Sequence, residues 1–278
     1  QGRARSLMVG FCFETVNWSP YFGFARPELR RMIRAAEATG FGWISFDLPS
    51  IAHFTANAGT LGALRDALAA ANVKLLAVHS LAIDGDVAKV ETLTREAMET
   101  CRALGAAYFH AGVIAPVDAQ VVAATRRAAD ICQESGVGFA IEFLPFLPVA
   151  SIGQTRSLLA AAGARRPGLV VDSWHFFNGL DDWDALAGIA ADEIAYVQFD
   201  DHGPLQSDDL LFETTEKRVM PGEGIFDLGR FASTLRGAGF DGVVGVEILS
   251  AASRAQPIEE VARRMMDTSK PYWQDGGR

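Results

Sequence analysis

The hydrophobic positions of this chain follow two patterns that alternate from one end to the other. In the longer stretches, apolar residues recur every three, four or seven positions, as Val90, Ala97 and Cys101 do within 86–105, and this spacing predicts one buried face of a helix. Between these stretches lie eight short runs rich in β-branched and aromatic residues, at 8–13, 43–47, 74–79, 108–111, 138–143, 168–172, 194–199 and 242–248. Strands that are apolar on both faces and alternate with helices predict a parallel sheet wrapped by helices.

Residues that favour helix ends mark the boundaries of several of these stretches. Pro27 opens the stretch 27–39 and Gly40 follows it, which is the order in which proline and glycine flank helices. Asp118 and Asp227 are placed to cap helices that begin just after them. The same segments therefore carry both the spacing and the end signals of helices.

The spacing of the strand ends separates a closed barrel from an open sheet. Most neighbouring ends are 26 to 34 residues apart, which matches one βα unit of about 30 residues. Eight such units predict a single (β/α)8 TIM barrel, and a Rossmann sheet is disfavoured because no Gly-x-Gly-x-x-Gly follows any strand. The last step is longer and holds a loop at 200–224, which is expected to cover the active face. We expect one domain over residues 1–278, with a disordered or expression-derived end at residues 1–6.

Composition narrows the class of partner. A formal net charge of −9 argues against a nucleic-acid partner, which would require a basic face. No apolar stretch reaches the roughly 20 residues that a membrane helix needs, so no membrane partner is expected. The three cysteines, Cys12, Cys101 and Cys132, are far apart, and the last two fall on the apolar faces of expected helices. This usage predicts buried thiols in a reduced, cytoplasmic protein.

Four oxygen-bearing side chains close the last four strands of the expected barrel. They are Glu142, Asp172, Gln198 and Glu247. Carboxyl ends of barrel strands converge on one mouth, where three carboxylates would repel one another unless a divalent cation lay between them. Oxygen donors favour Mn2+ or Mg2+, with Co2+ and Zn2+ as alternatives. The simpler interpretation of any one of them is that it caps the following helix or pairs with an arginine.

Other polar residues are placed to reach the same mouth. His175 lies three residues after Asp172, where it is positioned to transfer a proton, although a loop histidine bound to backbone is the simpler interpretation. Arg218 in the long loop is predicted to hold a substrate oxygen, with a surface ion pair beside Glu216 as the alternative. His79 and His110 close the third and fourth strands as substrate contacts or as structural rim residues.

Aromatic residues and a glycine-rich tract allow weaker hypotheses. Trp174, together with Phe13, Trp18, Trp43 and Phe143, is a candidate for an apolar wall around the substrate, and plain packing is the alternative. The tract 221–224, Pro-Gly-Glu-Gly, is placed where barrels bind phosphate, but it is short and acidic. We therefore interpret it as a turn.

Several motifs together resemble the xylose-isomerase-like TIM-barrel superfamily, over nearly the whole chain. They are Ile141-Glu142, Val171-Asp172-Ser-Trp-His175, Tyr196-Val-Gln198-Phe-Asp200, Arg218-Val-Met-Pro-Gly-Glu-Gly224 and Val246-Glu247. By this resemblance, the metal ligands would be Glu142, Asp172, Gln198 and Glu247. His175 and Arg218 would contact the substrate.

The resemblance implies enzymes that act on small polyhydroxylated carbonyl compounds. In epimerase members two glutamates transfer protons next to a carbonyl group, which gives Glu142 and Glu247 catalytic roles here beside His175. Many such members carry histidine where this chain has Gln198, and a glutamine there looks more like the 3-dehydroshikimate dehydratases. We expect a metal-dependent isomerase or epimerase of a keto-sugar or related polyol. A 3-dehydroshikimate or inosose dehydratase and a non-catalytic sugar-binding barrel are the alternatives. Members of the family often form homo-oligomers, which allows the same here.

Overall fold

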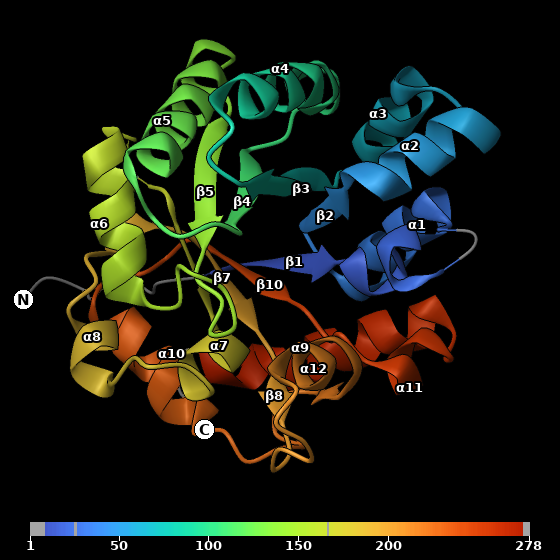
Figure 1. The fold of residues 1–278 in the computed structure, drawn as a ribbon. Coiled ribbons are helices and arrows are strands. Elements are labelled where there is room, and N and C mark those ends of the chain that lie inside the picture. The colour runs from blue at the N-terminus through green and yellow to red at the C-terminus, as the bar shows by residue number, and fades with distance from the viewer. Residues whose placement is uncertain (1–8, 25–26, 166, 275–278) are drawn as a thin grey trace, which may run out of the picture.

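The computed structural model describes residues 9–24, 27–165 and 167–274. The end predicted at residues 1–6 lies outside these ranges. Eight parallel strands form a closed barrel, and helices surround it (Figure 1). The strands are β1 Gly10–Glu14, β2 Trp43–Asp47, β3 Lys74–Ile83, β4 Tyr108–Val113, β5 Gly138–Glu142, β6 Leu169–Asp172, β7 Ile194–Phe199 and β10 Val243–Val246. The predicted TIM barrel is confirmed.

The barrel closes because β1 pairs with the last strand, β10, on one side and with β2 on the other. Each remaining strand pairs in parallel with its neighbours in sequence, so all eight carboxyl ends lie at one mouth. Strand β7 is buried along its whole length, as expected for a strand covered on both faces.

Helices follow the strands in the order that the sequence predicted. They are α1 Leu29–Thr39, α2 Leu48–Asn57, α3 Leu61–Ala70, α4 Val87–Leu104, α5 Ala119–Glu134, α6 Ile152–Ala162, α7 Ser173–Phe177, α8 Trp183–Ala187, α9 Leu210–Glu216, α10 Leu228–Gly237, α11 Ala251–Arg254 and α12 Ile258–Trp273. Short 3-10 turns occur at η1 Val16–Trp18, η2 Pro20–Phe22 and η3 Ala191–Glu193. None of the helices in the described ranges is both long enough and apolar enough to cross a membrane.

Three of the predicted end signals act as helix caps, whereas α1 begins at Leu29, two residues after the predicted start at Pro27. Asp118 accepts hydrogen bonds from the backbone amides of Gln120 and Val121, and Asp227 accepts one from the amide of Arg230. Gly40 ends α1 in the left-handed conformation, which a residue with a side chain rarely adopts. The first and last long helices meet, because α1 packs beside α12 and Arg31 forms a 2.7 Å ion pair with Glu259.

The long loop after β7 has secondary structure of its own. Strands β8 Asp201–His202 and β9 Arg218–Val219 form a two-stranded antiparallel sheet, and α9 lies between them in sequence. This small sheet fixes Arg218 at the barrel mouth.

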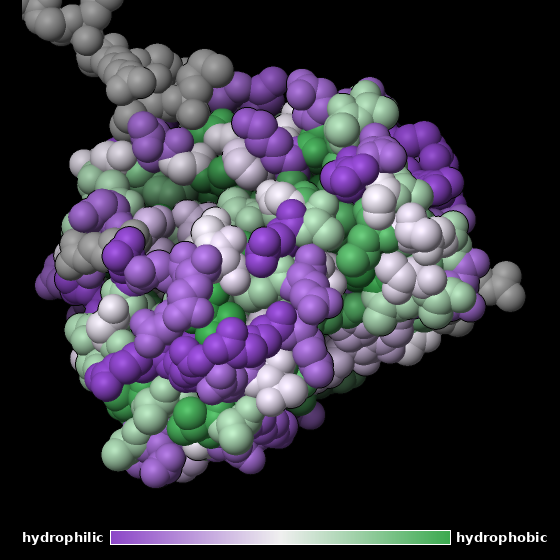
Figure 2. Space-filling model, turned by 90° about the horizontal axis from the view of Figure 1, so that it is seen from above, coloured by the Kyte–Doolittle hydropathy of each residue, from purple (hydrophilic) through white to green (hydrophobic). Residues whose placement is uncertain are grey.

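The interior of the barrel and the shell between strands and helices hold most of the buried apolar residues. All three cysteines are buried and unpaired, as predicted. On the face shown in Figure 2, hydrophilic residues are interspersed with hydrophobic ones.

Gly245 on β10 leaves space that a neighbouring side chain uses. A Cβ atom at this position would lie 2.3 Å from Oε1 of Glu14, whose carboxylate crosses toward β10 inside the barrel. A real Cβ contact is never that short, so any larger residue must displace the carboxylate. The missing side chain of Gly245 therefore makes room for Glu14.

We expect Gly245→Ala to lower the free energy of unfolding by about 1–3 kcal/mol, the usual cost of overpacking a rigid interior. Chemical denaturation measures this. Gly153→Ala on α6 is the matched control, because a Cβ atom there meets nothing within 4 Å. Equal stability of Gly245→Ala and Gly153→Ala would show that Glu14 moves aside freely.

Candidate active site

Five of the predicted site residues line one cavity of about 340 Å3 at the carboxyl mouth of the barrel: His79, Glu142, His175, Arg218 and Glu247. The other four lie beside the lining and contact it. Asp172 bonds to Arg218, Gln198 to Glu247 and His110 to Glu142, while Trp174 packs under the guanidinium of Arg218. Residues from strands β3 to β7, from the segments directly after β6 and β10, and from the long loop therefore form one connected group.

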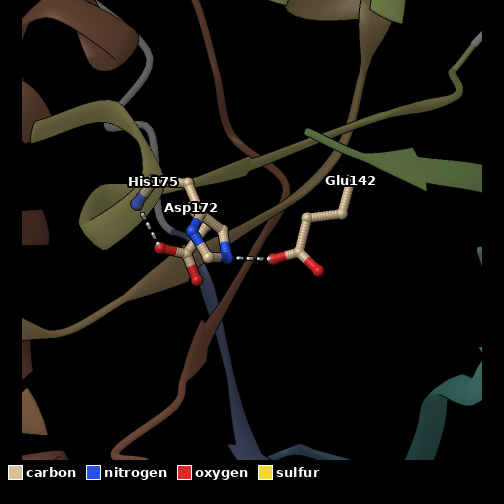
Figure 3. Close-up of side chains that lie close together, drawn as sticks. All are labelled: Glu142, Asp172 and His175. Carbon is tan, nitrogen blue, oxygen red and sulfur yellow. Dashed lines mark hydrogen bonds and ion pairs between the residues drawn. The ribbon is translucent and has the colours of Figure 1, made fainter. Parts of the chain in front are cut away.

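The cluster at the ends of β5 and β6 is drawn in Figure 3. Asp172 caps the short helix α7 by accepting a 3.1 Å hydrogen bond from the backbone amide of His175. This cap aims the imidazole at β5, where Nε2 of His175 lies 3.2 Å from Oε1 of Glu142. One ligand atom from each of Glu142, Asp172 and His175 lies within 4.8 Å of the others. Asp172 and His175 thus form the helix cap, and together with Glu142 they form the cluster of ligand atoms.

Arg218 is the cation that offsets the buried carboxylates. Its Nη1 donates to Oδ2 of Asp172 at 2.9 Å and to the carboxylate of Asp200, and it lies 3.3 Å from Oε2 of Glu247. The side chain is almost fully buried, and its Nε and Nη2 donate to Thr214 on α9. Asp172 thus makes the contacts of the simpler interpretation, because it caps a helix and pairs with an arginine. Arg218 is buried, so the alternative of a surface ion pair does not describe it.

These residues also fit a divalent cation. The side-chain oxygen of Gln198 and Nδ1 of His175 are buried, and neither has a hydrogen-bond partner. Buried polar atoms without partners are rare and call for an explanation. Two carboxylates, an amide oxygen and an imidazole nitrogen are a donor set that divalent metals accept. Glu142, Asp172 and His175 would be its nearest ligands, so the structure brings a nitrogen donor into a set that the sequence predicted as oxygen only.

The two glutamates have opposite electrostatic surroundings. Burial raises the pKa of Glu142, but His175 and His110 outweigh it and hold that pKa well below its usual value. Burial raises the pKa of Glu247 to about 8, and the nearby carboxylates add to this against the opposing charge of Arg218. In the absence of a bound cation, Glu142 therefore favours the ionised form and Glu247 the protonated form near neutral pH.

Sequence reasoning missed Glu14, which ends β1 one residue beyond the predicted strand end. Its carboxylate is buried, lies 3.2 Å from Nε2 of His79 and accepts a 3.2 Å hydrogen bond from Ser45. The rule that found Glu142, an apolar strand closing on a carboxylate, would also have found Glu14. This contact makes His79 one half of a buried ion pair.

His79 lies at an irregularity in its strand. The register between β3 and β4 shifts between Val78 and Leu81, and Ser80 adopts a positive φ of 104°. Such strained backbone tends to occur at functional sites, where it re-aims a side chain. The His79 ring packs on the His110 ring with 4.5 Å between centroids.

His110 connects this pair to Glu142. Its Nε2 lies 3.1 Å from Oε2 of Glu142 and its Nδ1 lies 2.5 Å from the hydroxyl of Tyr196. Burial lowers the pKa of His110, and the adjacent His79 lowers it further. The chain of contacts runs from Glu14 through the two histidines to Glu142, and His79 and Glu142 are the members that line the cavity.

The candidate aromatic wall does not line this cavity. Trp174 is fully buried and packs edge-on against His175 and His202, so it supports the site from behind. Phe13, Trp18 and Phe143 are also fully buried and belong to the core, and Trp43 is absent from the cavity lining. Packing, the alternative interpretation, describes these residues.

The glycine-rich tract is a turn, as predicted. The backbone amides of Gly222, Gly224 and Phe226 donate to the carboxylate of Asp201, which occupies the place where a phosphate would bind. A Cβ atom at Gly224 would lie 2.2 Å from that carboxylate. The tract therefore anchors the long loop to β8.

A sequence model described as xylose isomerase-like TIM barrel matches residues 33–270. The chain belongs to this family. The inosose isomerase of Bacillus velezensis is 29% identical over 183 residues, which cover 62% of this chain and 64% of that protein, slightly under two thirds of its length. The 3-dehydroshikimate dehydratase of Pseudomonas aeruginosa is 31% identical over 104 residues, which cover 37% of this chain and 16% of that enzyme.

A crystal structure of the IOLI protein with a bound zinc atom has the same fold. It superposes with a TM-score of 0.82 at 22% identity, covering 95% of this chain and 98% of the other. The resemblance predicted from the motifs is confirmed by the family match, and the predicted fold is confirmed by both.

The Glu14–His79 pair predicts a pH dependence of stability. Burial opposes the imidazolium, yet Glu14 raises the pKa of His79 from 6.5 to about 9. The folded protein thus binds a proton that the unfolded chain releases near pH 6.5. The stability that this proton contributes is complete below pH 6.5 and is lost as the pH rises through about 9.

We expect Glu14→Gln to flatten this fall in stability between pH 6.5 and 9, because the pair can no longer hold the proton. Urea denaturation at several pH values, with metal removed by a chelator, measures it. Glu99→Gln on the exposed side of α4 is the control and should keep the wild-type slope. An unchanged slope in Glu14→Gln would mean that Glu14 does not hold His79 protonated.

A second prediction concerns the cation. Because Glu142 supplies one of the three clustered ligand atoms, we expect Glu142→Gln to weaken Mn2+ binding by at least about tenfold. Calorimetric titration of chelator-treated protein measures this, and Glu99→Gln again serves as the control. Equal Mn2+ affinity in both variants would place the cation elsewhere.

Proposed function

We propose that this protein is a divalent-metal-dependent isomerase or epimerase of a keto-sugar or a related polyol such as an inosose. One observation carries the proposal. Two buried glutamates face the same cavity, and their surroundings shift their pKa values in opposite directions. A pair of titratable groups separated in this way is the arrangement that proton transfer between carbon positions needs. The similarity to the inosose isomerase of Bacillus velezensis supports the substrate class.

Each residue has a role in this proposal. Glu142 removes a proton from the carbon next to the substrate carbonyl, and Glu247 returns one. Arg218 holds Glu247 in place and presents positive charge to the substrate oxygens, while His79 and His175 donate hydrogen bonds from the cavity lining. A bound divalent cation supplies further positive charge for the oxygen that becomes negative during enolisation.

The donor set bears on the identity of the metal. We proposed Mn2+ or Mg2+ from oxygen ligands alone, and the approach of His175 makes the site less suited to Mg2+. Mn2+ accepts both carboxylate and imidazole ligands and remains our proposal, with Co2+ and Zn2+ as alternatives. The zinc atom in the IOLI structure supports keeping zinc among them.

A dehydratase of the 3-dehydroshikimate or inosose kind is the second candidate. Gln198 stands at a strand end where many epimerase members carry histidine, and 3-dehydroshikimate dehydratases of Pseudomonas are among the relatives. Both activities begin with the same proton removal, so the residues assigned above serve either one. The two differ in whether a hydroxyl group then leaves.

We further propose that the chain acts as one domain in a reduced, cytoplasmic setting, which the buried free thiols support. Its substrate is a small molecule, and neither nucleic acid nor membrane is proposed as a partner. A homo-oligomer stays a prediction.

Incubation of the Mn2+-loaded protein with inososes, ketoses and 3-dehydroshikimate in deuterated water tests the proposal. We expect deuterium incorporation next to the carbonyl group and an isomeric product, both followed by nuclear magnetic resonance. Ultraviolet absorbance from loss of water would identify the dehydratase instead.

Glu142→Gln and Glu247→Gln should each lower the rate by about 10²–10⁴-fold, which is the usual contribution of a general acid or base. Glu99→Gln is the matched control. Normal turnover by Glu247→Gln would remove that residue from the reaction, and the absence of deuterium incorporation from the whole panel would favour a binding protein.

A further inference from the structure

The cavity above Glu142 has two chemically different parts. Its floor is charged and carries the residues of the candidate active site. Its walls and rim are apolar and come from Tyr21 and Phe22 on η2, Ile114 after β4, Phe146 and Leu147 after β5, and Leu211 on α9. These segments all follow carboxyl ends of strands, so the apolar part lies between the charged floor and solvent.

The rim exposes large apolar side chains to water. Tyr21 is 75% exposed, Leu211 is 51% exposed and Ile114 is 49% exposed, although each also lines the cavity. Contiguous exposed apolar surface around a pocket marks a place where a ligand or partner binds. The rings of Tyr21 and Phe22 meet edge to face, 5.1 Å apart, so the rim also presents aromatic surface.

The size of the cavity bears on what fills it. The cavity has a volume of about 340 Å3. It falls at the lower end of the range, about 300–1,000 Å3, of pockets that take drug-sized ligands. A bare polyol has hydroxyl groups on every side and would leave the apolar rim facing water. A ligand with one hydroxylated end and one apolar end matches both parts.

We infer that the substrate is a polyhydroxylated carbonyl compound that carries an aromatic substituent, with the hydroxylated end on the charged floor and the ring against Tyr21, Ile114 and Leu211. This inference rests on the proposed function for the floor and adds the substrate class. An aromatic ring matches the rim because it removes apolar surface from water and packs edge-on against Tyr21 and Phe22. Continuity of floor and rim in one cavity favours a single ligand over a separate partner.

The test compares the binding of myo-inositol with that of its monobenzyl ether to the Mn2+-loaded protein by calorimetry. We expect the benzyl ether to bind at least about tenfold more tightly, which equals about 1.4 kcal/mol. That gain corresponds to removing roughly 55 Å² of apolar surface from water at about 25 cal/mol per Å². Equal affinity for the two compounds would overturn the inference.

Substitutions at the rim test whether the rim residues cause the tighter binding of the benzyl ether. Leu211→Ser and Tyr21→Ser should each reduce the advantage of the benzyl ether by several-fold and leave myo-inositol binding unchanged. Leu180→Ser is the matched control, because Leu180 is 80% exposed and is absent from the cavity lining. An advantage that survives both rim substitutions would overturn the inference. Light scattering provides a further check. If the wild-type protein were a dimer and Leu211→Ser a monomer, a second copy of the chain would cover the rim, and this too would overturn the inference.

The outcomes separate this inference from the proposed function. Deuterium incorporation into an inosose together with equal binding of the two inositols would leave the proposed function standing and remove the aromatic substituent. A binding advantage for the benzyl ether without deuterium incorporation into any carbonyl compound of the panel would leave the rim as a binding site for an aromatic ring and remove the proposed function.

Discussion

The mouth of this barrel depends on the neutralisation of buried negative charge. Five buried carboxylates gather there, from Glu14, Glu142, Asp172, Asp200 and Glu247. Moving an ion out of water costs several kcal/mol, and that cost is offset only when an opposite charge and hydrogen bonds replace the water. Without a bound cation, Arg218 contacts three of the carboxylates and His79 pairs with Glu14, while His110 and His175 lie beside Glu142. A cation that entered the site would share this role.

The buried carboxylates are not neutralised to the same extent, and the pKa values of Glu142 and Glu247 are therefore shifted in opposite directions. Histidines lie beside Glu142, whereas burial and then the other carboxylates raise the pKa of Glu247 against the charge of Arg218. Two residues of the same type therefore favour different protonation states inside one cavity. Local helix signals contribute to this, because the cap that Asp172 provides for α7 also aims His175 at Glu142. A single aspartate thus serves folding and the site at once.

The family fold alone does not define what the site accepts. Most charged residues at the bottom of the cavity lie at the ends of barrel strands, whereas the apolar residues of the rim lie in the loops after the strands. Loops vary more readily than barrel strands, since they lie on the surface and bear little of the core packing. The floor of this cavity thus comes mainly from the barrel strands, and its rim comes from the loops that follow them.

The sequence by itself determined the barrel and most of the floor. Periodicity, cap residues and the spacing of strand ends are local signals. They placed Glu142, Asp172, Gln198 and Glu247 within one residue of the ends of β5, β6, β7 and β10, which are neighbours in the barrel. Glu14 was equally accessible to that rule, and was missed because the first strand was ended one residue early.

Only the tertiary structure decided how these side chains share their charge. The burial of Arg218 among carboxylates, the pairing of Glu14 with His79 and the space left by Gly245 join residues far apart in sequence. The same holds for the walls of the cavity, where Trp18 and Trp174 are buried behind the lining and apolar residues of the loops form the rim. Such contacts depend on the three-dimensional approach of distant strands and loops. A local pattern of hydrophobic and polar positions carries no information about that approach.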